Sequence, residues 1–95
     1  MIRALPYKTE GAFRSATHRG SVFIDLTNET AMVWFLCPCG CGTTSRIRVG
    51  EKFKPDGSPS WEWNGSIPDP TLTPSIKQTV CGWHGVLRDG YWEAC

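Results

Sequence analysis

The chain has 95 residues and a formal net charge of +1, which leaves room for one domain and argues against strong electrostatic steering by either sign. No apolar run reaches the roughly 18 residues that a membrane span needs, and the polar start of the chain does not resemble a secretory signal. We therefore expect a cytoplasmic protein. In that reducing compartment clustered cysteines indicate metal ligands before disulfides.

The first half of the chain predicts an arm followed by two strands. Residues 1–20 show no clear period, so we expect a loosely structured N-terminal arm with at most a short strand near residues 12–16. β-branched and aromatic residues favour a strand over residues 21–26, and the polar residues 27–30 are typical of a turn. The continuous apolar run of residues 31–36 predicts a central strand that is buried on both faces.

The second half predicts further hairpins. Alternating residues 44–49 indicate a half-buried strand that leaves the cysteine cluster. We expect Asn64-Gly65 and Asp89-Gly90 to form tight turns between strands. Three prolines within residues 66–75 argue against a helix and against a central strand there. The predicted fold is mostly β: a small antiparallel domain built of hairpins around one metal site, with at most one short helix.

Two cysteine-containing segments predict one metal site, most simply a zinc site. Cys37, Cys39 and Cys41 lie in the sequence C-P-C-G-C-G, and Cys81 and His84 follow at C-x-x-H spacing. Zinc prefers a tetrahedron of thiolate and imidazole ligands, and glycines permit the tight backbone turns that a zinc knuckle needs. The two segments therefore read as the halves of a single site that spans residues 37–84.

The choice of four ligands among these residues stays open. We favour Cys39, Cys41, Cys81 and His84, with Cys37 as the alternative thiol of the first half. Cys95 and His18 are expected to be a spare thiol and an exposed histidine. The alternatives are free cysteines, disulfides, or an iron–sulfur cluster, for which Cys41 stands where a Rieske pattern has histidine.

Tryptophans and basic residues allow two interpretations each. The four tryptophans outside the predicted central strand either form an exposed aromatic face or shield a small core: Trp61, Trp63, Trp83 and Trp92. A basic strand and loop next to two of them resembles a nucleic-acid surface or is a solvated strand face: Arg46, Arg48, Lys52 and Lys54. The near-neutral charge favours the second interpretation.

The order of motifs resembles a known family. C-P-C-G-C-G, W-x-W-N-G, P-T-x-x-P-S-I, C-x-x-H and D-G, within residues 37–90, are similar to small proteins of unknown function from phages, prophages and bacteria, some of them labelled ammonia monooxygenase. The resemblance implies a compact zinc-binding β domain without an established activity. A phage-encoded member would reside in the cytoplasm of the host bacterium.

Three functions are compatible with these observations. The first is a structural-zinc module of phage or prophage origin that binds a protein partner. The second is a nucleic-acid-binding zinc module. The third is a small metal-dependent hydrolase, for which Glu62 and Asp89 are the carboxylates nearest to the motifs, although no known zinc-enzyme signature is present. The first is preferred, because the cluster already offers four ligands without an open position.

Overall fold

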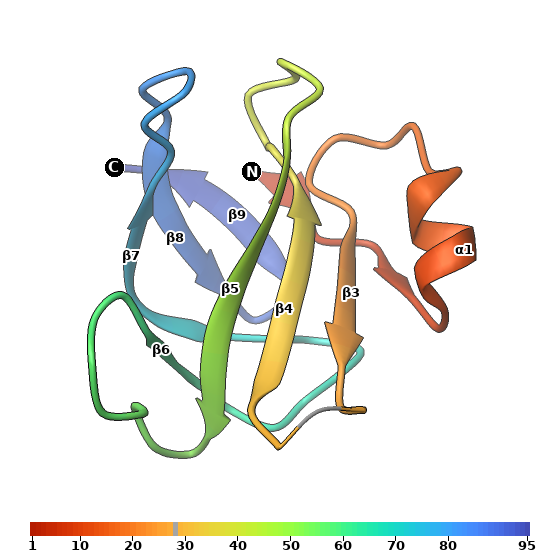
Figure 1. The fold of residues 1–95 in the computed structure, drawn as a ribbon. Helices are drawn as coiled ribbons and strands as arrows, with labels where there is room; N and C mark the ends of the chain where they lie inside the picture. Colours follow the sequence, from red (N-terminus) through yellow and green to blue (C-terminus); the bar gives the residue numbers. More distant parts are fainter. Residues whose placement is uncertain (28) are drawn as a thin grey trace.

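The computed structural model describes residues 1–27 and 29–95, and it consists mainly of one strongly curled, nine-stranded sheet (Figure 1). The strand order is β1-β9-β8-β7-β6-β5-β4-β3-β2. Most neighbours are antiparallel, whereas β2 and β3, and also β5 and β6, run parallel. The predicted mostly β fold with one short helix is therefore confirmed. No helix among the described residues is long and apolar enough to cross a membrane.

The N-terminal segment contains three short elements: β1 (Ile2–Arg3), β2 (Pro6–Tyr7) and α1 (Glu10–Arg14). The predicted strand near residues 12–16 is wrong, because a helix forms there. Thr9 caps this helix, and its side chain accepts a hydrogen bond from the backbone N–H of Ala12 at 3.1 Å. Phe13 of the helix is buried, so the segment expected to be a loose arm contributes to the packed structure.

The next three strands follow the sequence pattern: β3 (Val22–Asp25), β4 (Ala31–Leu36) and β5 (Thr44–Glu51). β4 and β5 are antiparallel, and their pairing ends where Leu36 lies opposite Thr44. The residues between them form the tip of the hairpin, so the prediction of a cysteine-bearing hairpin tip is confirmed. The turn predicted at residues 27–30 includes Asn28, which lies outside the described residues.

β4 lies between β5 and β3 in the sheet but is fully buried on one face only. Val33 and Phe35 are 0% exposed, whereas Trp34 between them is half-buried. Trp34 packs edge-on against Phe13 of α1, with the ring centroids 6.5 Å apart. The prediction of burial on both faces is therefore wrong for the outer face, where the five-residue α1 packs against Trp34 but leaves it half-buried.

The last four strands are β6 (Trp61–Trp63), β7 (Leu72–Lys77), β8 (His84–Arg88) and β9 (Tyr91–Ala94). β8 and β9 form the predicted last hairpin, in which Arg88 lies opposite Tyr91. Asp89 and Gly90 both have positive φ angles, 49° and 81°, as a type I′ turn requires. The predicted tight turn at Asp89-Gly90 is confirmed.

The proline-containing segment departs from the prediction. β7 lies between β6 and β8 and includes Pro74, so a central strand does form here. The strand accommodates the proline because the pairing of β7 with β8 shifts register between Leu72 and Ile76, and irregular ladder positions tolerate the missing N–H. Gly65 has the expected positive φ of 85°, but residues 64–71 form a longer connection than a two-residue turn.

The tryptophans mainly shield the core, which is the second of the two interpretations considered. Trp63 and Trp92 are each 1% exposed, and Trp61 and Trp83 pack against the buried cluster from its edge. Trp92 lies beside Phe35, with ring centroids 5.0 Å apart. The core therefore joins strands from both halves of the chain.

Three of the four basic residues contact other parts of the chain. Arg46 lies over the Trp34 ring on the outer face, 5.4 Å from its centroid. Arg48 donates to the carbonyl of Asp56 at 2.8 Å, and Lys54 donates to Ser60 Oγ at 3.1 Å. These intramolecular contacts favour the interpretation of a solvated strand face.

The β8–β9 turn allows a direct test of the fold. Gly90 is buried and has a positive φ, so Gly90→Ala should lower the free energy of unfolding by about 1–3 kcal/mol. Gly11, which lies in α1 with open space around it, supplies the control. Gly11→Ala should leave stability unchanged or raise it by up to about 1 kcal/mol. Equal urea midpoints for Gly90→Ala and the wild type would contradict the turn.

Candidate functional site

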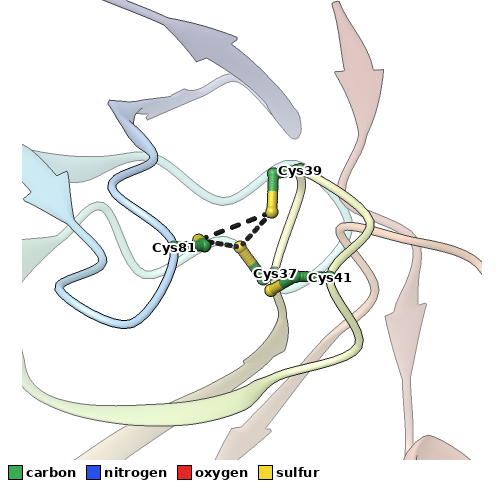
Figure 2. Close-up of side chains that lie close together, drawn as sticks. All are labelled: Cys37, Cys39, Cys41 and Cys81. Carbon is green, nitrogen blue, oxygen red and sulfur yellow. Dashed lines mark hydrogen bonds between the residues drawn. The ribbon is translucent and has the colours of Figure 1, made fainter.

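Two hairpin tips that are distant in sequence meet at one end of the sheet (Figure 1). Residues 37–43 join β4 to β5 and carry Cys37, Cys39 and Cys41. Residues 78–83 join β7 to β8 and carry Cys81. Figure 2 shows the Cys81 side chain pointing toward those of Cys37 and Cys39. The fold therefore brings together the two segments that the sequence singled out.

The sulfur atoms have the spacing of a metal site. Cys37 Sγ lies 3.3 Å from Cys39 Sγ and 3.5 Å from Cys81 Sγ, and Cys39 Sγ lies 3.4 Å from Cys81 Sγ. All four sulfurs, including that of Cys41, lie within 4.8 Å of one another. A tetrahedron of thiolates at the usual Zn–S distance of about 2.3 Å has sulfur–sulfur edges of about 3.8 Å. The four thiols could therefore hold one metal ion of this kind with small adjustments.

The backbone of the first tip explains why glycines flank its cysteines. The N–H of Gly40 donates to the carbonyl of Cys37 at 3.1 Å, and the N–H of Cys37 donates to the carbonyl of Thr43 at 2.9 Å. Gly40 and Gly42 have φ angles of 88° and 85°. Side chains with a Cβ rarely adopt this conformation, so the turn that gathers three thiols depends on these glycines.

The second tip is tied to the first without a metal. Gln78 is largely buried, and its side chain makes two hydrogen bonds with Ser45 of β5, at 3.1 and 2.8 Å. Its backbone N–H donates to the carbonyl of Trp83 at 2.7 Å, and its carbonyl accepts from Gly82 at 2.8 Å. Gln78 therefore closes the tip around Cys81 and links it to the neighbouring hairpin.

The thiols of this site differ in their tendency to ionise. Burial raises the pKa of the Cys37 thiol to about 12. Hydrogen bonds from the Thr43 hydroxyl and backbone N–H lower the pKa of the exposed Cys41 thiol to about 6. Because thiolates bind metals and thiols do not, a bound cation would supply the positive charge that lets the buried Cys37 ionise.

The other predicted site residues lie apart from the four thiols. His84 does not belong to the group of possible ligands among the described residues, so its role as a ligand stays a prediction. Cys95 is exposed and lies outside the group too, and its backbone N–H donates to the carbonyl of His84 at 2.9 Å. His18 is exposed as expected, with Nε2 3.0 Å from the carbonyl oxygen of Arg3.

His84 has a partner that the sequence analysis missed. Its Nε2 lies 2.9 Å from the hydroxyl oxygen of Ser75. Ser75 is in β7, within the register shift between Leu72 and Ile76, and His84 begins β8 opposite Lys77. Because His84 lies opposite Lys77 and alternate residues of a strand share a face, Ser75 and His84 are diagonal neighbours on one face of the sheet. The available signal was a serine and a histidine nine positions apart, on either side of Cys81.

The pair has the arrangement of a nucleophile and its base. A serine hydroxyl that is hydrogen-bonded to an imidazole nitrogen can transfer its proton to that nitrogen as it attacks a carbonyl. His84 is exposed and Ser75 is half-buried, so a substrate can reach both. Within the described residues no carboxylate side chain hydrogen-bonds to His84, and Asp89 contacts Thr71 instead. The hydrogen-bonded group therefore consists of Ser75 and His84 without a carboxylate among the described residues.

Comparison with known proteins identifies one family. Residues 9–95 match the family model described as "Bacterial ubiquitination-like system serine protease (BubE)". No curated protein and no solved structure matches the chain. The phage or prophage origin suggested by the motifs stays a prediction.

The ligand set predicts which cysteine variants lose metal. Cys37→Ser and Cys81→Ser should each lower the metal content of the purified protein well below the one ion per chain expected for the wild type, because each removes one of four clustered sulfurs. Cys95→Ser should keep the full content, because Cys95 lies outside the cluster. Elemental analysis measures all three. Loss of metal in Cys95→Ser, or its retention in Cys81→Ser, would contradict the assignment.

Proposed function

This chain belongs to the family of bacterial ubiquitination-like system serine proteases (BubE), and we propose that it is a serine peptidase with Ser75 as nucleophile and His84 as general base. The hydrogen bond between Ser75 Oγ and His84 Nε2, 2.9 Å long, is the observation that carries the proposal. This hydrogen bond connects a serine, the nucleophile that the family's description implies, with a histidine, the commonest catalytic base. Both residues stand on strands, which hold a reacting pair more rigidly than loops do.

The dyad supports a two-step acyl transfer. Ser75 Oγ attacks the substrate carbonyl carbon, and its proton passes to His84 Nε2. The imidazolium then donates that proton to the leaving amine as the carbon–nitrogen bond breaks, which leaves an ester on Ser75. Water attacks this ester, His84 accepts a proton from the water, and the proton returns to Ser75 Oγ as the acid leaves.

The proposed substrate is an amide bond at the carboxyl end of a ubiquitin-like protein. A ubiquitination-like system forms bonds between such a carboxyl group and an amine, and a peptidase of that system would hydrolyse them or trim a precursor at the same carbonyl. The exposed His84 and the half-buried Ser75 favour an extended, accessible chain terminus. The protein partner expected from the sequence would then be this substrate.

We assign the metal a structural role in this function. Four thiolates fill the coordination positions of zinc and leave none for water or substrate. A zinc ion bound there would crosslink the two hairpin tips, and Cys81 lies three residues before His84 in the chain. Cys37, Cys39, Cys41 and Cys81 are the residues that would hold it. This arrangement favours serine chemistry over the metal-dependent hydrolysis considered from the sequence.

The proposal predicts covalent labelling of one serine. A fluorophosphonate probe should modify Ser75 in the wild type, and both Ser75→Ala and His84→Ala should lower labelling by at least about 100-fold. Ser75→Ala removes the oxygen that the probe modifies. His84→Ala removes the general base, whose assistance contributes about 10²–10⁴-fold. The matched controls are Ser58→Ala and His18→Ala, which alter an exposed serine and an exposed histidine away from the dyad and should label normally. Mass spectrometry identifies the labelled residue, and cleavage of a ubiquitin-like fusion provides a second readout.

The metal content of His84→Ala separates the two roles considered for this histidine. A base outside the thiol cluster leaves the metal content unchanged when it is replaced. If His84 instead ligates the metal, His84→Ala should lower the metal content. The loss of labelling would then result from disruption of the metal site. An unlabelled wild type with full metal content would contradict the peptidase and favour the interaction module.

A further inference from the structure

Two indoles in the three-residue strand β6 each donate a hydrogen bond to a backbone carbonyl. Trp63 Nε1 donates to the carbonyl of Ser66 at 2.9 Å, within the connection that follows β6. Trp61 Nε1 donates to the carbonyl of Ser75 at 3.2 Å, on β7. The Trp63 indole therefore restrains the connection after β6, and the Trp61 indole restrains Ser75, which carries the proposed nucleophilic hydroxyl.

Ser75 lies next to the regular backbone pairs of β7 and is not one of them. β6 pairs with β7 only where Glu62 lies opposite Thr73 and Trp63 opposite Leu72. On the other side, regular pairing of β7 with β8 resumes at Ile76. Ser75 therefore belongs to neither run of regular pairs, and the Trp61 indole spans the gap on the β6 side.

Trp61 is itself held in place. Its backbone pairs with Val49 of β5 in the parallel β5–β6 ladder, and its half-buried ring packs against the core cluster. A hydrogen bond from such a fixed indole restrains the Ser75 carbonyl, and with it the Cα atom from which the Ser75 side chain extends. The hydroxyl oxygen of that side chain lies 2.9 Å from His84 Nε2.

We infer that Trp61 is the positioning residue for the Ser75 nucleophile. The inference rests on the peptidase function proposed above. Trp61 touches neither reacting atom and acts through the backbone of Ser75, whose carbonyl accepts the hydrogen bond of the indole N–H. Small displacements of a nucleophile are costly, because about 1 Å of misplacement can lower a rate by 10²-fold.

The test removes the N–H and keeps most of the ring. Trp61→Phe retains an aromatic side chain against the core but cannot donate to the Ser75 carbonyl. Trp63→Phe makes the same change two residues away, where the lost hydrogen bond serves Ser66, so it controls for the general cost of removing an indole from β6. Both variants are made in the full chain with its metal, and metal content and thermal midpoint are recorded for each.

The kinetics of fluorophosphonate labelling supply a readout that a packing role would not move. Trp61→Phe should lower the maximal inactivation rate about tenfold and leave the probe concentration for half-maximal rate unchanged, because the N–H positions the nucleophile and does not bind the probe. Trp63→Phe should retain the wild-type rate, even if its thermal midpoint falls further.

Each other outcome has a defined meaning. Equal inactivation rates for Trp61→Phe and the wild type would overturn the positioning role and leave the dyad intact. The positioning role would also be overturned if both variants lost the same fraction of the inactivation rate in proportion to their lower thermal midpoints. The effect of the substitution would then be structural. A wild type that the probe does not label would instead contradict the peptidase function itself.

Discussion

The junction of two hairpin tips through four thiols is the constraint on which the rest of the structure depends. Cys37 and Cys81 are separated by 44 positions, yet their sulfurs lie 3.5 Å apart. A small domain has a thin core, and metals often supply the missing stability. Structural zinc contributes on the order of 10 kcal/mol in small zinc domains, which is comparable to the whole stability of such a fold. A metal at this junction would therefore determine how the β7–β8 hairpin sits on the sheet.

The same hairpin carries the proposed chemistry. Ser75 lies on its first strand and His84 begins its second. The Ser45–Gln78 hydrogen bonds fix its tip against β5, and the Trp61 indole holds its first strand from the side of β6. The thiol cluster, the buried Gln78 and the Trp61 indole therefore all restrain the β7–β8 hairpin. This arrangement explains how a dyad on a short, irregular strand pair can keep a fixed geometry.

Much of this structure could be predicted from local sequence. Apolar runs and alternation located the strands around the first cysteine segment, and Asp89-Gly90 marked a type I′ turn because both residues tolerate positive φ. The clustering of thiols predicted the meeting of the two tips. The N-terminal helix was missed because it has only five residues, too few for helical periodicity, and depends on the Thr9 cap.

The contact between Ser75 and His84 was missed for a different reason. Pro74 argued against a central strand, so Ser75 was not placed on a strand beside β8. The position of β7 depends on tertiary pairing with β6 and β8, which the local pattern does not encode. His84 was predicted to be a metal ligand because C-x-x-H spacing suits one, and this stays a prediction; the structure brings Cys81 to three other thiols. Spacing alone does not decide between these roles.

The most direct test of the account measures Ser75 labelling while metal is removed. The protein is titrated with a strong chelator and then with zinc, and fluorophosphonate labelling is followed together with the near-UV circular dichroism of the tryptophans, including Trp83 between Cys81 and His84. The account predicts that labelling and the tryptophan signal fall together as metal is lost and return together with zinc. Full labelling and an unchanged spectrum in metal-free protein would contradict the claim that the thiol site organises the hairpin.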